Sequence, residues 1–324
     1  MDEQIERLRR EISGETAGSG ARSAALRALL DELLELAIAD TDDRDLRVAA
    51  NSLRELLEAS RVFSPWRDRP KLTVFGSARA KPDSMLYQMA IELSREMAER
   101  GWMTVSGAGP GIMEAAARGA GLDNTLGVNI DLPFEQSSNP YVDAETRLVE
   151  MKYFFTRKVA LTKESLAFAI FPGGLGTMDE AFEVLTLLHT GKSNSAPVLL
   201  VDSAEGMFWE RWQSFIDEAV VAGGYLDADA RCLFKVCHSV EATIDAIEHF
   251  YVNYVSFDLE DTVGSIQLRH APTRAQLVQL ASQVPSLDGE PYEVVDESRV
   301  TFRFDGRNYV YLRRLIDALN QLVC

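Results

Sequence analysis

The sequence predicts a doubly wound α/β fold over about residues 63–255, a parallel, Rossmann-like sheet with helices on both faces. From Lys71 onward, short apolar runs alternate with helical patterns. This alternation implies right-handed crossovers between parallel strands. The runs are apolar throughout instead of alternating with polar residues, which is typical of strands that are buried on both faces.

The expected strands and helices follow one another in pairs, apart from the strand TLGVNID, which has no helix directly behind it. The segment MKYFFTRKVALTKES is expected to be helical from residue 151 to about 162. The other pairs, written as strand and then helix, are LTVFGS and 84–100, WMTVSG and 111–121, LAFAIFPGG and 177–190, APVLLVD and 205–222, and FKVCHS and 240–252.

Residues 1–62 are expected to form helices only. Asp42 and Asp43 are candidate caps for a second helix, and Gly14, Gly18 and Gly20 suggest a loose joint before the first. We expect a helical cap without chemistry of its own, packed on the main domain or on another subunit. Apolar residues in the first helix recur at helical spacing and share one face; they are Leu26, Leu29, Leu30, Leu33 and Leu36.

Residues 256–324 predict a small α+β domain. SIQLRH reads as a strand, and a helix is expected to start at Thr273. Strands are expected at PYEVVD, RVTFRFD and RNYVYL, with Asp305-Gly306 as a tight hairpin turn between the last two. The run RRLIDALNQLV is expected to close the chain as a helix.

The charge balance excludes some classes of partner. The 324 residues include 33 basic and 50 acidic side chains, which gives a net charge of −17. Non-specific binding of nucleic acid depends on Lys and Arg that neutralise phosphates, so this chain is not expected to bind nucleic acid. A small anionic ligand stays possible, because backbone N–H groups at a helix start bind phosphate whatever the net charge.

The sequence also favours a cytoplasmic protein without a membrane segment. No run approaches the roughly 18 apolar residues that span a bilayer, and the charged start MDEQIERLRR does not resemble a signal peptide. The three cysteines, an odd and sparse set, fit free thiols in a reducing compartment. Cys232, Cys237 and His238 lack the spacing and the fourth ligand of a usual zinc site.

Glycine-rich segments follow three of the expected strands, where ligands bind in open parallel sheets. Glycine lets the backbone approach a ligand closely. Tight turns alone would explain one such loop, but three in a single sheet favour a nucleotide-sized ligand. None matches the dinucleotide fingerprint or a P-loop. The loops are FGSAR at 75–79, SGAGPGIME at 106–114 and FPGGLGTMDE at 171–180.

The third loop is the most specific for phosphate. Thr177 is expected at a helix N-terminus, where its hydroxyl and free backbone N–H groups can bind an anion. Glu180 and Glu183 then share one helix face. Two readings of Glu180 stay open: a functional carboxylate, or a capping-box partner that reaches back to Thr177. Glu183 can equally be an ordinary surface acid.

Arg157 and Lys158 are adjacent on the expected helix at 151–162, beside Phe154 and Phe155. A guanidinium suits bidentate binding of phosphate or of a pair of sugar hydroxyls. A solvated basic pair is the alternative. Nothing else in the sequence supports a Schiff-base lysine with pyridoxal phosphate.

Together, PGGLGTMDE and the upstream FFTRK resemble the paired motifs of the Lonely Guy (LOG) family, phosphoribohydrolases of nucleoside 5′-monophosphates that are often mislabelled as lysine decarboxylases. The resemblance runs over about residues 71–222 and includes FGSAR and GPGIME. Residues 127–143 are similar to the longer bacterial relatives. Molybdenum-cofactor carriers share the fold and much of the glycine pattern, so a non-catalytic carrier is the alternative function.

The resemblance implies that Arg157 and Glu180 are catalytic and that the third loop binds the 5′-phosphate. Glu114 departs from the plant-type pattern, which has a glycine at that place and a three-glycine run before it. This departure bears on base specificity. The residues expected to bind substrate are Gly76, Ser77, Gly107, Gly109, Gly111, Met113, Glu114, Met151, Lys158, Gly173, Gly174, Gly176, Thr177 and Glu183.

The expected reaction is hydrolysis of the N-glycosidic bond of an AMP-like or cytokinin-type nucleotide to free base and ribose 5-phosphate. It passes through an oxocarbenium-like sugar and is expected to need no metal or other cofactor. A signalling role of the flanking domains is a third possibility. Apolar residues beyond one sheet-facing stripe at 177–190, with Phe154 and Phe155, predict a homodimer or higher homo-oligomer, unless the N-terminal helices cover them.

Overall fold

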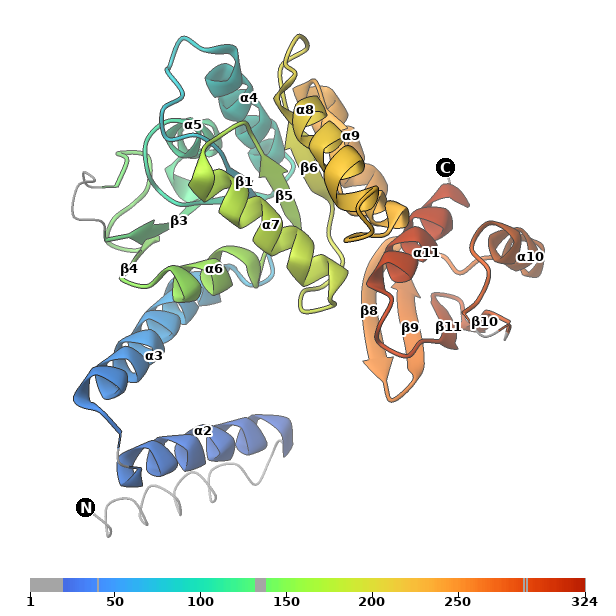
Figure 1. Cartoon of the computed structure of the whole chain (residues 1–324), viewed down its shortest axis with the longest axis horizontal. Coiled ribbons are helices and arrows are strands. Elements are labelled where there is room, and N and C mark those ends of the chain that lie inside the picture. Colours follow the sequence, from blue (N-terminus) through green and yellow to red (C-terminus); the bar gives the residue numbers. More distant parts are fainter. Residues whose placement is uncertain (1–19, 40, 132–137, 288, 290, 324) are drawn as a thin grey trace. The chain divides into compact units, whose positions relative to one another are not determined.

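The computed structural model describes residues 20–39, 41–131, 138–287, 289 and 291–323 (Figure 1). The chain forms two compact units that divide between Glu55 and Leu56. The three-part division expected from the sequence, with boundaries at 62/63 and 255/256, stays a prediction.

The first unit holds α2 (Gly20–Ile38) and most of α3 (Asp43–Phe63). Asp42 caps α3, because its carboxylate accepts a hydrogen bond from the Arg44 N–H at 2.7 Å. The helical expectation is therefore confirmed for the described part. Gly20 belongs to α2 and not to a joint, and Gly14 and Gly18 lie outside the described residues.

The second unit is built on a seven-stranded parallel sheet, which confirms the predicted fold class. The strand order is β4-β3-β2-β1-β5-β6-β7, so the chain starts in the middle and winds outward in both directions. The central strands are buried on both faces. The strands are β1 (Lys71–Phe75), β2 (Met103–Ser106), β3 (Thr125–Ile130), β4 (Leu148–Met151), β5 (Ala167–Ile170), β6 (Val198–Val201) and β7 (Lys235–Cys237).

Helices cover the two faces of this sheet and produce two separate apolar cores. On one face, α4 (Met85–Glu99), α5 (Ile112–Ala120) and α9 (Val240–Phe250) pack against alternate residues of the strands. The other face is covered by the end of α3 and by α6 (Phe154–Thr162), α7 (Leu175–His189) and α8 (Phe208–Phe215). Both sides of the central strands are thus removed from water, which explains their continuous apolar runs.

Two differences from the expected elements concern the edges of this sheet. β4 was not expected; it pairs in parallel with β3 from Gly127↔Leu148 to Ile130↔Met151. Met151 therefore ends a strand, and the helix that was expected to start there begins at Phe154. The helix expected at 205–222 begins at Phe208, whose N–H donates to the Asp202 carboxylate at 3.0 Å, and it continues as a π-helix, Ile216–Val221.

The C-terminal segment forms a second, antiparallel sheet in the order β10-β11-β9-β8. β8 crosses the predicted boundary at 255/256 and was not expected. α10 (Arg274–Gln283) begins as predicted, with a capping box between Thr273 and Gln276. The strands are β8 (Tyr254–Glu260), β9 (Val263–Leu268), β10 (Glu293–Asp296) and β11 (Arg299–Arg303).

The prediction of a strand at RNYVYL is wrong. Asn308 caps the last helix, α11 (Tyr309–Gln321), by accepting a hydrogen bond from the Tyr311 N–H at 2.9 Å. Asp305-Gly306 therefore precedes a helix, and it does not form a hairpin turn between two strands. The alternation in YVYL continues at helical spacing into Leu315, Ile316 and Leu319, all of which are buried in the C-terminal core.

Candidate active site

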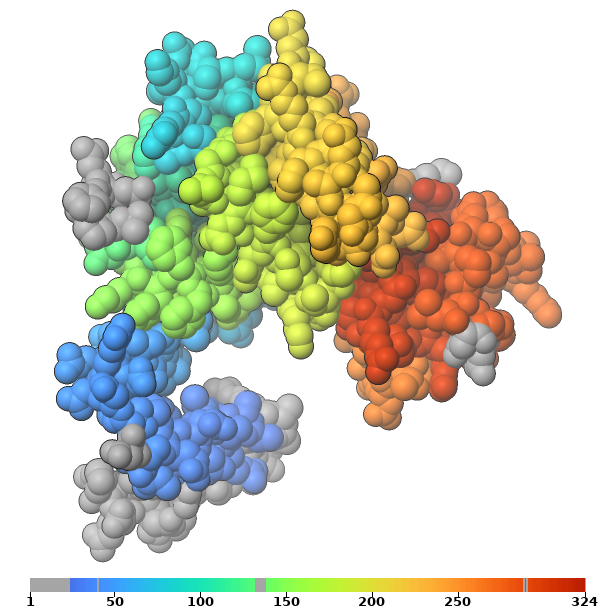
Figure 2. All heavy atoms as spheres, in the orientation of Figure 1, coloured from blue at the N-terminus to red at the C-terminus, as the bar shows by residue number. Residues whose placement is uncertain are grey.

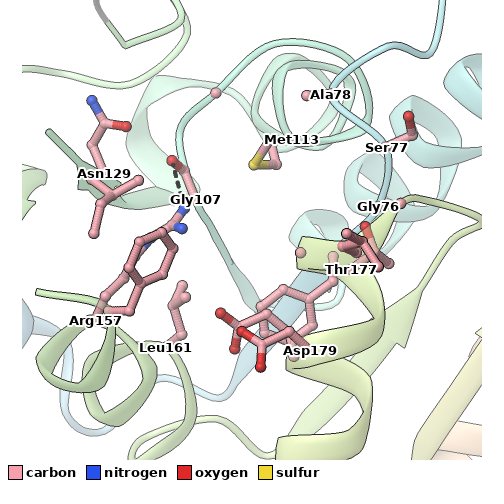
Figure 3. Close-up of a pocket in the computed structure, with 18 of the residues that line it drawn as sticks. Gly76, Ser77, Ala78, Gly107, Met113, Asn129, Arg157, Leu161, Thr177 and Asp179 are labelled. Atoms are coloured by element: carbon pink, nitrogen blue, oxygen red, sulfur yellow. Dashed lines mark hydrogen bonds between the residues drawn. The ribbon is translucent and has the colours of Figure 1, made fainter. Parts of the chain in front are cut away.

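A cavity of about 710 Å³ lies at the carboxyl ends of β1, β2, β3 and β5 (Figure 3). This is the edge at which ligands bind in doubly wound folds, and the volume suits a small molecule. Backbone hydrogen bonds tie its loops together: Ser77 N–H donates to Pro172 O at 3.1 Å, and Ile112 N–H donates to Ser77 O at 3.0 Å. The glycine-rich segments thus form one connected rim.

The cavity brings together most of the residues predicted from the sequence. Both candidate catalytic residues line it, together with parts of all three glycine-rich loops. The functional roles of these residues stay predictions. The lining residues among those predicted are Gly76, Ser77, Gly107, Gly109, Met113, Arg157, Gly174, Gly176, Thr177 and Glu180.

Six predicted substrate contacts do not line this cavity. Gly111 and Gly173 shape the rim from behind; Gly111 has a φ of +69°, and a Cβ on Gly173 would collide with Thr177 Oγ1. Glu114 lies on α5, where it accepts a hydrogen bond from the Tyr87 hydroxyl at 3.1 Å. Met151 is buried at the end of β4. The other two are Lys158 and Glu183, which pair with each other.

The start of α7 is the candidate anion-binding end of the cavity. The helix begins at Leu175, directly after Gly174, so Thr177 lies in its first turn. The first N–H groups of a helix have no acceptor within the helix, and the helix dipole favours negative charge there. A Cβ on Gly174 or Gly176 would meet only open space. These features together make a cradle for a phosphate.

Gly176→Ala is expected to separate folding from binding. Alanine is favoured over glycine in a helix by about 1 kcal/mol, and the free space around Gly176 accommodates its methyl group. The same methyl would occupy the cradle. We therefore expect a higher melting temperature and a weaker affinity for nucleoside monophosphates, measured by calorimetry. As a control, Gly119→Ala should lower the melting temperature, because its Cβ would collide with the backbone of Ile91.

Arg157 is fixed by the backbone of two neighbouring strands. Its Nε donates to Val128 O on β3 at 3.0 Å, and its Nη2 donates to Gly107 O, directly after β2, at 3.4 Å. Figure 3 shows the bond to Gly107. A Cβ on Gly107 would overlap the guanidinium, so the glycine of the second loop makes room for this arginine. The alternative of a solvated basic pair at 157–158 is wrong, since the Lys158 side chain is only 14% exposed.

Ala108, in the second loop, adopts a left-handed backbone with φ 56°. This conformation costs a residue other than glycine roughly 1–2 kcal/mol. Asn139 holds the loop in place: its N–H donates to Ala108 O at 2.9 Å and its Nδ2 to Gly109 O at 3.0 Å. The loop thus keeps a glycine-like shape at Ala108.

Glu180 is a buried carboxylate, 6% exposed, on the cavity wall. Among the described residues, its Oε2 has no hydrogen-bond donor, although Lys158 Nζ lies 3.7 Å away. Burial raises the pKa of Glu180, and the positive charges of Lys158 and then Arg157 oppose that shift. The capping-box alternative is wrong, because α7 begins at Leu175 and Glu180 lies beyond its first turn.

Several residues that line the cavity were not predicted from the sequence. Asn129 has the clearest sequence signal, because it is the one polar side chain near the end of the apolar strand TLGVNI. Asp179 belongs to the third glycine-rich loop and directly precedes Glu180, the residue that was predicted to be catalytic. The apolar residues carry no signal, since only the topology brings them together. The missed residues are Phe75, Ala78, Arg79, Asn129, Ile130, Phe154, Leu161, Leu175 and Asp179.

Asn129 and Thr177 mark opposite sides of the cavity. Thr177 follows β5, whereas Asn129 lies on β3, and β1 and β2 separate the two strands. Figure 3 shows them on either side of Met113. A ligand with its phosphate at α7 therefore reaches toward Met113 and Asn129, where the amide of Asn129 can both donate and accept hydrogen bonds.

The described residues lack two features that would indicate other functions. None of their helices is long and apolar enough to cross a membrane. Within the same residues, no group of three or more His, Cys, Asp or Glu side chains is placed to hold a metal ion. At the zinc cluster considered above, His238 Nδ1 instead bonds Ser203 O.

Comparisons with known proteins identify the family to which this chain is similar. Residues 111–247 match the family model described as "Possible lysine decarboxylase". A cytokinin riboside 5′-monophosphate phosphoribohydrolase of Rhodococcoides fascians is 31% identical over 59% of this chain and 96% of its own length. The enzyme of the same name, LOG, from Oryza sativa subsp. japonica is also 31% identical, over 55% of this chain and 72% of its own length.

Among solved structures, the X-ray structure of TM1055, a structural-genomics target, is 26% identical with a TM-score of 0.39. That alignment covers 55% of this chain and 98% of TM1055. The sequence identity to the bacterial enzyme over nearly its whole length decides the assignment. This chain belongs to the LOG family of cytokinin riboside 5′-monophosphate phosphoribohydrolases.

Proposed function

We propose that this protein hydrolyses the N-glycosidic bond of a nucleoside 5′-monophosphate and releases the free base and ribose 5-phosphate. One observation carries the proposal: a buried carboxylate, Glu180, and an anchored guanidinium, Arg157, line the same cavity, which begins at a helix N-terminus. These three features supply a negative charge, a positive charge and an anion-binding helix end to one ligand.

The proposed mechanism starts from the phosphate. The first turn of α7 binds it, and this binding energy positions the ribose beside Glu180. As the bond to the base breaks, positive charge develops on the sugar. The Glu180 carboxylate stabilises that charge or removes a proton from the attacking water. Arg157 holds the ribose or the phosphate in this geometry, and the proton taken from water leaves with the base.

We propose an adenine-containing monophosphate such as AMP as the substrate. The two relatives above are named for cytokinin riboside 5′-monophosphates, which are adenine nucleotides with a substituted amino group. With the phosphate at α7, the base lies toward Met113 and Asn129. An Asn amide pairs well with the amino group and N7 of adenine.

A panel of nucleoside 5′-monophosphates tests this proposal. The purified protein is incubated with AMP, GMP, CMP, UMP and an N6-substituted AMP, and free base is measured by chromatography. We expect adenine from AMP. If a monophosphate binds by calorimetry and none releases its base, the protein is a carrier and not an enzyme. An adenosine sample serves as a control, and it should react much more slowly because it lacks the phosphate.

We also propose that the working unit is a homodimer or a higher homo-oligomer. α6 and α7 lie side by side at the surface (Figure 2), and several of their large apolar residues are exposed: Phe154, Phe155, Leu175 and Phe182. Solvent is an unfavourable neighbour for such a patch. Light scattering at assay concentration should give at least twice the chain mass of 36.0 kDa. An active particle of one chain mass would contradict the proposal.

The proposed location is the cytoplasm. Cys232 and Cys237 are free thiols in the described structure, and free thiols fit a reducing compartment. Fractionation of the cells that make the protein, followed by detection with an antibody, tests this location. The protein should appear with soluble cytoplasmic markers.

A further inference from the structure

We propose that Lys158 is a positioning residue that keeps Glu180 ionised and oriented toward the cavity. The inference rests on the proposed function for its catalytic meaning, but it concerns a contact between α6 and α7 that can be measured without activity. It assigns Lys158 a role other than the direct substrate contact that the sequence suggested.

Three carboxylates of α7 surround the ammonium group of Lys158. Its Nζ lies 3.0 Å from Asp179 Oδ2, 3.7 Å from Glu180 Oε2 and 3.8 Å from Glu183 Oε2. The same Nζ also donates to Asp179 O at 3.4 Å. Lys158 does not line the cavity. It therefore approaches Glu180 from behind the cavity wall.

Burial distinguishes the pair of Lys158 and Glu180 from surface ion pairs of the chain, although Asp179 and Glu183 are 56% and 39% exposed. The side chains of Lys158 and Glu180 are 14% and 8% exposed, whereas those of Arg47 and Asp43 are 76% and 86% exposed. Exposed pairs contribute little because water screens them. A charge that is removed from water instead needs a partner, or it becomes neutral. For the buried Glu180 Oε2, Lys158 is that partner.

The charges around Glu180 come from both helices and one loop. Lys158 and Arg157 face it from α6, and Asp179 and Glu183 flank it on α7. Arg79, after β1, lines the same cavity. Burial, Asp179 and Glu183 favour the neutral acid, and Lys158 is the largest opposing influence on the pKa of Glu180, ahead of Arg157.

Burial raises the pKa of Glu180 and Lys158 lowers it, so the direction of change in a Lys158 variant can be predicted. Removing the positive charge of Lys158 raises the pKa of Glu180, so the carboxylate becomes protonated at a higher pH. A single opposite charge at this range moves a titration by roughly 1–3 pH units. Lys158→Met keeps the length and the apolar stem of the side chain while it removes the charge. Lys158→Arg keeps the charge.

The direct test is a titration of glutamate labelled with ¹³C at the carboxyl carbon, followed by NMR. The Glu180 resonance is assigned by its loss in Glu180→Gln. In Lys158→Met we expect the Glu180 midpoint to rise by about one pH unit or more. It should return to near the wild-type value in Lys158→Arg. Glu183→Gln should shift it the other way, because a negative neighbour is removed.

The matched control is Lys163→Met. Lys163 is the C-cap residue of α6, 48% exposed, and it pairs with Glu164 instead of with the α7 carboxylates. This variant should leave the Glu180 midpoint unchanged. An equal midpoint in wild type and Lys158→Met would overturn the proposal, and so would equal shifts in Lys158→Met and Lys163→Met.

Kinetics then connect the contact to the reaction. In Lys158→Met, the acidic limb of the kcat profile should move to higher pH by the same interval, so that activity lost near neutrality returns at alkaline pH. A raised KM with an unmoved acidic limb would mean that Lys158 binds substrate directly, and would overturn the positioning role. If the wild type releases no base, the proposed function fails, and the NMR titration still decides the role of Lys158.

Discussion

Glu180→Gln is expected to lower turnover by a factor on the order of 10² or more, the scale of a lost catalytic base or electrostatic stabiliser. Glutamine has the shape of glutamate but carries no charge, so it cannot stabilise a cationic sugar or accept a proton from water. Lys158 keeps Asp179 and Glu183 as partners in this variant. The loss should therefore appear in kcat more than in KM.

The stability of Glu180→Gln should be equal to or higher than that of the wild type at neutral pH. The sequence alone suggests a residue outside the core, but Glu180 is buried and its folded-state pKa is raised above the ordinary value of 4.5. Ionisation of Glu180 therefore costs stability above the folded pKa, and this cost vanishes as the pH falls below 4.5. Glutamine removes the cost.

Melting curves at pH 4 and pH 8 check the predicted stability of Glu180→Gln. Single-turnover kinetics check its predicted loss of turnover. The surface variant Glu99→Gln on α4 provides the control and should match the wild type in turnover. If Glu180→Gln keeps near-normal turnover, the carboxylate has only a structural role. If the variant unfolds, the comparison moves to Glu180→Asp, which keeps the charge but moves it back by one methylene.

The second large effect is expected for Arg157. Arg157→Ala should also lower turnover by a factor on the order of 10² or more, because one anchored charge positions the reacting sugar and phosphate. Arg157→Lys should recover little of this loss. Lysine carries the charge, but one ammonium group cannot bond Val128 O and Gly107 O in the fixed fork that the guanidinium provides.

The measurement is kcat and KM for the monophosphate that reacts fastest, with Arg95→Ala on α4 as the control. Arg95 is 55% exposed and pairs with the adjacent Glu96. Full recovery in Arg157→Lys would show that charge alone matters and that the two backbone anchors are incidental. A wild-type kcat in Arg157→Ala would remove Arg157 from the mechanism.

The periodicity of the sequence predicted the central sheet because its signal is strong there. Four central strands are buried on both faces: β1, β2, β5 and β6. Helices follow these strands, and some begin with a clear capping residue, such as Ser84 before α4. β4 escaped prediction because the run LVEM is short and contains the charged Glu150 at the sheet edge. The sequence pattern of four residues does not predict a strand that forms mainly because it pairs with a neighbouring strand, as β4 does with β3.

The C-terminal helix shows the opposite failure. The segment YVYL alternates in a way that suggests a strand, but residues further along decide its conformation. Tyr311 and Leu312 join the same buried core as Leu315 and Ile316, whereas Val310 packs in a core of the parallel sheet. Four residues fit both the two-residue period of a strand and the 3.6-residue period of a helix. Only the longer segment that includes Leu315 and Ile316 fits the helix period alone.

For the candidate site, motifs identified the residues but not their arrangement. Nothing in the sequence shows that Lys158 turns toward α7 or that Glu114 bonds Tyr87 instead of facing the cavity. Both depend on which face of a helix meets which neighbour. Asn129 was missed for a similar reason, since its position on the cavity wall follows from the strand order.

The most direct test of the proposed function is hydrolysis of AMP in water enriched in ¹⁸O, with both products analysed by mass spectrometry. The mechanism predicts adenine and ribose 5-phosphate in equal amounts, with ¹⁸O on the anomeric carbon of the sugar and none in the phosphate. Unchanged AMP recovered from its complex with the protein would contradict it. So would adenosine with labelled inorganic phosphate, which would show attack on phosphorus instead of on the sugar.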